Sequence, residues 1–206
     1  MFMGETMSDL SDSDLIEQLQ NGNLEALGDL YDRYRMVVYR TTLAITGDPE
    51  AANDLLQDVF LRLHRYVGHV DRSRPLEPWL YRMATNLSYT WIKRNRRWMH
   101  QFEEFFDWLA GSDRNGPHEY VEREDEWREM RQALLSLPVQ QRVVVVLYYL
   151  NDLSLQEISE ILEVPTGTVK SRLHYGRISL RKHLGITELE EGEALSNLNW
   201  KGSEGV

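Results

Sequence analysis

The chain contains no cysteine, so neither a disulfide framework nor a metal site built on thiolates is available to its 206 residues. It also lacks an apolar run long enough for a membrane span, and its acidic N-terminus has neither the basic start nor the apolar core of a signal peptide. These absences predict a cytoplasmic protein without membrane insertion. Its length and its 42% hydrophobic content suffice for one or two small domains with real cores, and we expect two.

Charge is distributed unevenly along the chain, and the formal net charge of -10 conceals two basic segments. Residues 1–30 contain no lysine or arginine, whereas residues 72–97 carry seven basic side chains against one glutamate. The chain turns acidic again over residues 98–126, and a second basic segment lies near the C-terminus. Local fields of this kind decide which partner a surface attracts, so the acidic total does not exclude a nucleic acid.

The second basic segment belongs to a helix-turn-helix pattern over residues 153–184. Ser154 stands before an apolar helical repeat and Glu157 follows three positions later, which is the spacing of a capping box. The inner side of this short first helix carries Leu155, Ile158 and Leu162. Pro165 fixes its own φ and disfavours an α conformation at the residue before it, so residues 164–167 supply a turn.

The helix after this turn directs Val169, Leu173 and Leu180 inward and leaves an outer face without a single carboxylate. Such a face is suited to phosphate, so we expect this helix to read duplex DNA in the major groove. A solvated surface, or a helix-turn-helix that contacts protein, is the alternative. The candidate DNA-binding residues of this helix are Thr168, Lys170, Ser171, Arg172, His174, Tyr175 and Arg177.

Apolar residues at helical spacing predict helices throughout the rest of the chain. Two amphipathic helices are expected within residues 14–39, with a break at 21–23, followed by a third over about 50–66 and a fourth over about 79–98. The inner stripe of the third helix should consist of Leu55, Leu56, Val59, Leu63 and Tyr66. The apolar run 143–150 resembles a strand, yet its neighbours are helical and no partner strand is visible, so we expect a buried helix. The predicted fold class is all-α.

Turn-forming residues at 111–117 mark the boundary between two small helical domains. We expect one helical domain over residues 1–98, an acidic linker over 99–126 and a helix-turn-helix domain over 127–184. The glutamate-rich tail 185–206 is expected to be disordered. The linker also carries apolar side chains that should dock on the protein's own domains or, alternatively, on a partner; these are Phe102, Phe105, Phe106, Trp108 and Leu109.

The fourth helix mixes basic and aromatic residues, a combination typical of proteins that bind unpaired bases. The carboxamide of Asn86 can hydrogen-bond the edge of an extruded base, although a local cap or turn is the ordinary role of a lone asparagine. Trp79, Tyr81 and Tyr89, taken singly, are more often core residues. The candidate residues for binding a single strand are Arg82, Asn86, Trp91, Lys93, Arg94, Arg96 and Arg97.

Catalytic and metal-binding patterns are missing from the sequence. His64 and His69 lie five positions apart rather than four, and no His-Glu-x-x-His motif occurs. There is no glycine-rich phosphate loop followed by lysine, and no nucleophile motif built around serine. We therefore expect no enzyme activity, no catalytic residues, no cofactor and no metal.

Four motifs, in this order, resemble those of the extracytoplasmic-function (ECF) sigma factors, the small two-domain initiation factors of bacterial RNA polymerase. They are DLLQDVFL at 54–61, PWLYRMATNL at 78–87, LP at 137–138 and PTGTVKSRL at 165–173. The resemblance spans about residues 14–184. It implies a sigma factor that binds core polymerase, recognises and melts promoter DNA, and starts transcription.

The resemblance also implies roles for individual residues. The second motif would melt the minus-ten promoter element, with Asn86 in the pocket for a flipped base, and the helix-turn-helix would read the minus-thirty-five element. The linker would occupy the path of nascent RNA. The polymerase flap and an anti-sigma factor are further implied partners. The clamp helices of the largest polymerase subunit would be contacted by the first motif, through Asp54, Gln57, Asp58, Phe60 and Leu61.

Two positions depart from the usual family pattern. Thr90 stands where aspartate is common, and Tyr175-Gly176 replaces a frequent Arg-Ala in the reading helix. Because this arginine is absent, we expect an altered promoter preference rather than a loss of function. The alternative is a conventional repressor or activator that binds duplex DNA unaided, since the C-terminal half alone fits both. The basic, aromatic fourth helix favours the sigma factor, because a sensor would have a ligand-binding domain there.

Overall fold

A computed structural model describes the chain over residues 10–110 and 128–185, with side chains for all of these except residues 96–110. Every regular element in these ranges is a helix, so the predicted all-α class is confirmed. Several expectations lie outside the described residues. They are the turn at 111–117, the tail beyond 185, the aromatic side chains of the linker, and the side chains of Arg96 and Arg97.

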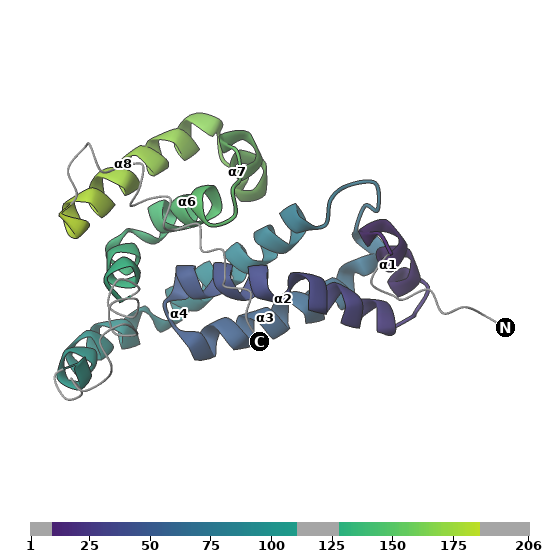
Figure 1. Cartoon of the computed structure of the whole chain (residues 1–206), viewed down its shortest axis with the longest axis horizontal. Coiled ribbons are helices and arrows are strands. Elements are labelled where there is room, and N and C mark those ends of the chain that lie inside the picture. The colour runs from purple at the N-terminus through teal and green to yellow at the C-terminus, as the bar shows by residue number, and fades with distance from the viewer. Residues whose placement is uncertain (1–9, 111–127, 186–206) are drawn as a thin grey trace, which may run out of the picture.

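The first half of the chain forms a group of helices that we call the N-terminal bundle (Figure 1). It consists of α1 (Asp12–Gln20), α2 (Glu25–Thr46), α3 (Pro49–Tyr66), the 3-10 turn η2 (Val67–His69) and α4 (Glu77–Ala110). The break predicted at residues 21–23 is confirmed. Gly47 ends α2 in the left-handed conformation, at a φ of 73°, and Asp48 caps α3 through its side chain.

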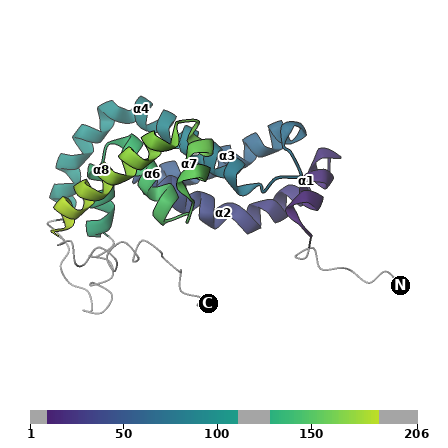
Figure 2. The ribbon, with the colours of Figure 1, turned by 90° about the horizontal axis from the view of Figure 1, so that it is seen from above.

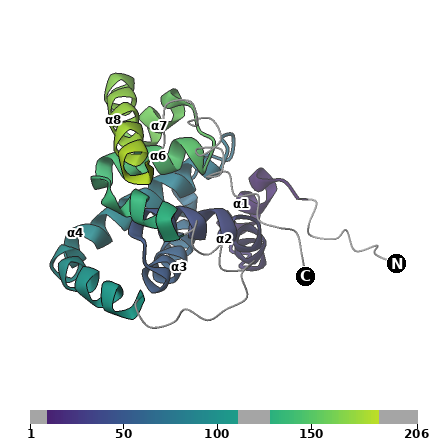
Figure 3. The same ribbon diagram turned by 60° about the vertical axis from the view of Figure 1, so that its left-hand side comes forward.

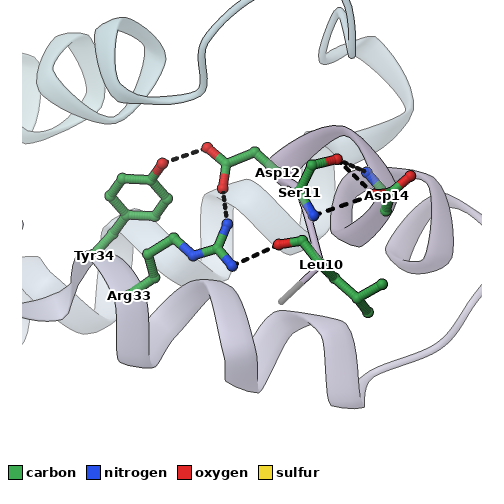
Figure 4. A network of polar contacts seen from close by, with 6 residues as sticks. All are labelled: Leu10, Ser11, Asp12, Asp14, Arg33 and Tyr34. Carbon is green, nitrogen blue, oxygen red and sulfur yellow. Dashed lines mark hydrogen bonds and ion pairs between the residues drawn. The ribbon is translucent and has the colours of Figure 1, made fainter. Parts of the chain in front are cut away.

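Polar contacts fix α1 on α2 (Figure 4). The carboxylate of Asp12 accepts hydrogen bonds from the hydroxyl of Tyr34 and the guanidinium of Arg33. Arg33 Nη2 also donates to the backbone carbonyl of Leu10, at 2.7 Å. Burial, followed by the hydrogen bond to Asp12, raises the pKa of Tyr34 well above its ordinary value. The short α1 is therefore anchored by charge-assisted hydrogen bonds in addition to its buried apolar face.

Two details of α3 and α4 differ from expectation. Leu55, Leu56, Val59 and Leu63 are buried as predicted, but the prediction for Tyr66 is wrong, since its side chain is 46% exposed at the end of α3. Helix α4 was expected to end near residue 98 and continues to Ala110. The reason lies in the sequence, because no glycine or proline occurs between Pro78 and Gly111 to end the helix.

The second half of the chain forms the C-terminal bundle. It consists of the helical segment 128–136, α6 (Val139–Tyr149), α7 (Leu155–Leu162) and α8 (Thr166–Leu184). The apolar run that resembled a strand lies in α6, and its residues 143–147 are all buried, which confirms the prediction of a buried helix. Helix α6 packs against α7 and α8.

The two bundles pack against each other. Ile45 of α2, together with Tyr81 and Ile92 of α4, belongs to the same buried cluster as the core of the C-terminal bundle. Helix α2 contacts α6, and α4 contacts α7. Views from above and from the side keep α6, α7 and α8 beside the N-terminal bundle (Figures 2 and 3). Buried side chains from both bundles therefore share one core.

Candidate nucleic-acid interface

The turn before α8 is built by side chains as well as by backbone. Ser154 and Glu157 form the predicted capping box at the start of α7, and the hydrogen bond to Ser154 lowers the pKa of the Glu157 carboxyl. Glu163 ends α7 in the left-handed conformation, at a φ of 53°. The hydroxyl of Ser159 donates to the carbonyl of Val164 at 2.6 Å, which holds the turn against α7. This local order fixes the angle at which α8 leaves the turn.

Helix α8 turns its apolar side inward and its candidate DNA-binding residues mostly outward. Val169, Leu173 and Leu180 are buried, as predicted. The exposed residues are Lys170, Ser171, His174 and Tyr175, and Tyr175 is 58% exposed. Thr168, Arg172 and Arg177 are half-buried, and Arg172 donates to the side chain of Gln140 at 3.1 Å. The outward face of α8 over residues 168–178 is therefore polar, basic and aromatic without a carboxylate.

A second carboxylate-free face runs along α4. Asn86, Tyr89 and Lys93 follow one another at spacings of three and four, so they share one side of the helix, and all three are exposed. Arg94 is exposed beside them, whereas Trp91 is half-buried against both cores. Taken singly, Tyr89 is expected in the core, yet its side chain is 46% exposed. Its helical spacing from Asn86 and Lys93 was the signal in the sequence that placed it on this face.

Thr90 contributes to the absence of negative charge on the α4 face. Its hydroxyl donates to the backbone carbonyl of Asn86 at 2.8 Å, so the side chain is satisfied within the helix. An aspartate at this position would place a negative charge next to Lys93 and Arg94. With threonine there, no carboxylate occurs anywhere between Glu77 and Glu103.

Arg82 differs from the other candidates on α4 because it has a partner in the C-terminal bundle. Its guanidinium forms an ion pair with the carboxylate of Glu163, the residue that ends α7. The Arg82 side chain is 38% exposed and that of Glu163 is 70% exposed. One candidate strand-binding residue is therefore held by the turn that precedes the candidate duplex-reading helix.

The outer face of α3 presents four of the five residues expected to contact a protein partner. Asp54, Gln57 and Asp58 are exposed, and Leu61 is the most exposed large apolar side chain among them at 63%. Phe60 must be withdrawn from this set, because its side chain is only 5% exposed. Its ring packs edge-on against Tyr31 of α2, with 4.9 Å between ring centroids. Phe60 therefore supports the face from inside the bundle.

The described residues contain neither a candidate metal site nor a helix suited to a membrane. Within 10–110 and 128–185, no group of three or more histidine, aspartate or glutamate side chains is arranged to hold a metal ion. In the same ranges, no helix combines the length and the apolar character that a bilayer crossing requires.

Two protein families match the chain in the same order as its two bundles. The pattern of "Sigma-70 region 2" matches residues 30–98, and that of "Sigma-70, region 4" matches residues 127–180. SigW of Bacillus subtilis, an ECF RNA polymerase sigma factor, is 34% identical over 180 residues, which cover 82% of this chain and 94% of that protein. SigE of Mycolicibacterium smegmatis is 36% identical over 158 residues, covering 76% of this chain and 61% of that protein.

Solved structures show the same fold. CnrH, in complex with the cytosolic domain of CnrY, is 21% identical with a TM-score of 0.63, covering 84% of this chain and 97% of that one. The sigma factor RpoE of Bartonella quintana, in complex with the anti-sigma factor NepR, is 20% identical with a TM-score of 0.59, covering 78% and 98%. The two matched regions contain the carboxylate-free faces of the helices α4 and α8, and the relatives belong to the same family. The chain belongs to the ECF sigma factors of the sigma-70 family, which direct transcription initiation.

Proposed function

We propose that the two bundles divide the work of promoter recognition between them. The N-terminal bundle binds core RNA polymerase through α3 and melts the minus-ten element through α4. The C-terminal bundle reads the minus-thirty-five element as duplex through α8 and contacts the polymerase flap. The observation that carries this proposal is the exposed face of Asn86, Tyr89, Lys93 and Arg94, since aromatic and basic groups without a carboxylate suit an unpaired strand.

Melting requires no bond to be made or broken by the protein. Arg82, Lys93, Arg94, Arg96 and Arg97 neutralise the phosphates of the displaced strand, and Tyr89 offers a ring on which a base can stack. Asn86 binds the edge of an extruded base through its carboxamide. Each trapped base lowers the free energy of the melted state relative to the duplex. The protein therefore acts through binding energy and not as an enzyme.

The α8 face reads the other element in the major groove. Lys170 and Ser171 lie in the second turn of α8, near the end of the helix that enters the groove in helix-turn-helix proteins. Arg172, His174, Tyr175 and Arg177 continue this surface toward the phosphate backbone. Tyr175 and His174 also contact each other edge-on, with 5.4 Å between ring centroids, so the two rings present a joint surface.

Binding to polymerase holds both DNA-binding faces near the same promoter. Asp54, Gln57, Asp58 and Leu61 dock on the clamp helices, which tethers both faces near one promoter and raises the effective concentration of each for its own element. This work takes place in the cytoplasm, where polymerase and DNA are. RpoE was solved in complex with the anti-sigma factor NepR, so an anti-sigma factor that covers these faces is a further partner.

Run-off transcription tests this proposal. Purified bacterial core polymerase is assayed with and without the chain on DNA fragments that include the region upstream of its own gene. We expect a defined start site only when the chain is present, and mapping that start gives both promoter elements. Absence of any start, together with tight binding of the chain alone to duplex DNA, would contradict the proposal and support a conventional regulator.

A further inference from the structure

The middle of α8 presents an apolar patch, formed by Tyr175 and Ile178, on the side of the helix that faces away from the protein. Tyr175 is 58% exposed and Ile178 is 42% exposed. By contrast, Val169, Leu173 and Leu180 of the same helix are buried. Phosphate offers no apolar group to an isoleucine, so binding to the DNA backbone does not account for this patch.

The patch lies on the outermost line of α8. Ser171, Tyr175 and Ile178 follow one another at spacings of four and three, so they share one side of the helix. The buried Leu173 lies on the opposite side, against the core of the C-terminal bundle. The ring of His174 meets the ring of Tyr175 edge-on and supports it from one side. A partner that approaches α8 from outside therefore meets these apolar side chains directly.

The exposed side chains in the middle of α8 carry no lysine, arginine or carboxylate. Between Lys170 and Lys182, the exposed side chains are those of Ser171, His174, Tyr175 and Ile178. The arginines of this stretch are half-buried, and one of them, Arg172, donates to the side chain of Gln140 in α6 at 3.1 Å. The surface that the middle of α8 offers to a base is therefore largely apolar.

We propose that Tyr175 and Ile178 recognise thymine in the minus-thirty-five element through its C5-methyl group. This inference rests on the proposed function, because it takes α8 to read duplex DNA in the major groove. In that groove guanine presents two acceptors, cytosine a donor and adenine a donor beside an acceptor, whereas thymine alone adds an apolar methyl group. Apolar side chains pack on this methyl group but would leave the polar edges of the other bases without partners.

The patch also fits the major groove in size. Ser171 and Ile178 are seven residues apart, which at about 1.5 Å per residue is about 10 Å along the helix axis. The major groove is about 12 Å wide. The exposed Lys170 and Lys182 stand on either side of the patch, about 18 Å apart along the axis. A duplex that both lysines contact therefore covers the patch.

Replacement of thymine by uracil tests the methyl contact without any change to the protein, since uracil lacks only the C5-methyl group. Core polymerase with the full-length chain is bound to promoter fragments that carry its preferred minus-thirty-five element. Each thymine of the element is then replaced in turn by uracil. We expect the affinity to fall about fourfold at one or two positions, which is the effect of one buried methyl group. Uracil between the two promoter elements is the control and should leave the affinity unchanged.

Variants of the patch connect the uracil effect to α8. In Tyr175→Ala or Ile178→Ala, uracil at the sensitive position should cause little further loss of affinity, because the contact is already missing. Tyr175→Phe keeps the ring and Ile178→Val keeps a branched apolar side chain, so both should retain most of the uracil effect. Met36→Ala shortens a 49% exposed side chain of α2 and should retain all of it.

Tyr175→Arg tests the specificity in the opposite direction. An arginine donates to the O6 and N7 acceptors of guanine. In a library of minus-thirty-five variants, the preferred base at the pair read by position 175 should therefore change from thymine to guanine, by about fivefold or more. A preference equal to that of the parent would show that position 175 does not contact a base.

The other outcomes separate this inference from the proposed function. A defined transcription start from an element in which no uracil lowers the affinity, or which contains no thymine, would overturn the inference and leave the proposed function intact. An equal uracil effect in the parent, Tyr175→Ala and Ile178→Ala would place the methyl contact elsewhere on the protein. Weaker binding of Ile178→Ala to core polymerase without DNA would show that the patch contacts protein instead. Absence of any start would contradict the proposed function, and this inference with it.

Discussion

Gly176 of α8 lies so close to Val145 of α6 that a Cβ on Gly176 would sit 2.8 Å from Val145 Cγ2. Val145 is fully buried and β-branched, so its methyl group cannot move away without disturbing the core. An alanine at position 176 therefore does not fit this chain without a shift of the core. The Tyr175-Gly176 departure is therefore explained in part by packing between α6 and α8.

The first prediction concerns this contact. Gly176→Ala should lower the free energy of unfolding by about 1–3 kcal/mol, since the added methyl overpacks the core and outweighs the helix propensity gained. Gly167→Ala, in the same helix and with open space around its Cβ, should be neutral or slightly stabilising. Urea unfolding followed by circular dichroism measures both. Equal stabilities of the two variants would contradict the close packing.

Local structure was largely predictable from the sequence, because caps, turns and apolar periodicity act over a few residues. The capping box at Ser154 and the buried helix over residues 143–147 follow from such signals. The contacts between bundles were not predictable. Glu163 and Arg82 are 81 positions apart, and nothing in either segment marks the other as its partner. Phe60 shows the same limit, since one motif can mix exposed contacts with residues that support them from inside.

A second prediction concerns alkaline pH. The raised pKa of Tyr34 means that its hydroxyl stays protonated in the folded chain when unfolded tyrosine, near pH 10, begins to ionise. Its contribution to stability is therefore complete below about pH 10 and is lost as pH rises through the folded pKa. Tyr34→Phe should make the fall in the free energy of unfolding above pH 10 less steep, and should cost about 1 kcal/mol at neutral pH through the lost bond to Asp12.

Urea unfolding at a series of pH values measures this slope. Tyr89→Phe removes an exposed hydroxyl and serves as the matched control, with the stability profile of the parent expected. If the free energy of unfolding of Tyr34→Phe varied with pH as in the parent, burial and Asp12 would not raise the pKa of Tyr34.

A third prediction concerns polymerase binding. Leu61→Ala should weaken binding to core polymerase by about 1–2 kcal/mol, because a side chain 63% exposed in the free chain would become buried against the clamp helices. Leu24→Ala is a matched control, since Leu24 is 61% exposed but precedes α2 and does not belong to α3. Fluorescence titration with core polymerase compares the two variants. A similar loss of affinity in both variants would show that Leu61 is not part of the polymerase interface.

A fourth prediction concerns the melted strand. Arg94→Ala should reduce the slope of log affinity against log salt by about one unit, because one phosphate loses its partner. The loss in affinity should be similar at all promoters, since phosphate contacts carry no base information. Arg35→Ala, which removes a 52% exposed arginine from α2, should leave the slope unchanged. Open-complex formation by the polymerase complex, measured from low to high salt, provides both slopes.

The last prediction concerns base readout by α8. Lys170 is exposed in the second turn of α8, where a side chain can reach a base edge in the major groove. A lysine there donates to guanine acceptors, and such a contact is worth about 1–3 kcal/mol of discrimination between bases. Lys170→Ala, and separately Ser171→Ala, should therefore change which minus-thirty-five sequences work. Lys182→Ala, at the far end of the same helix, should not change the relative transcription from the different minus-thirty-five sequences. Transcription from a library of minus-thirty-five variants measures these preferences. If Lys170→Ala and Ser171→Ala both kept the parent's preference among the variants, α8 would only position the protein on the phosphate backbone.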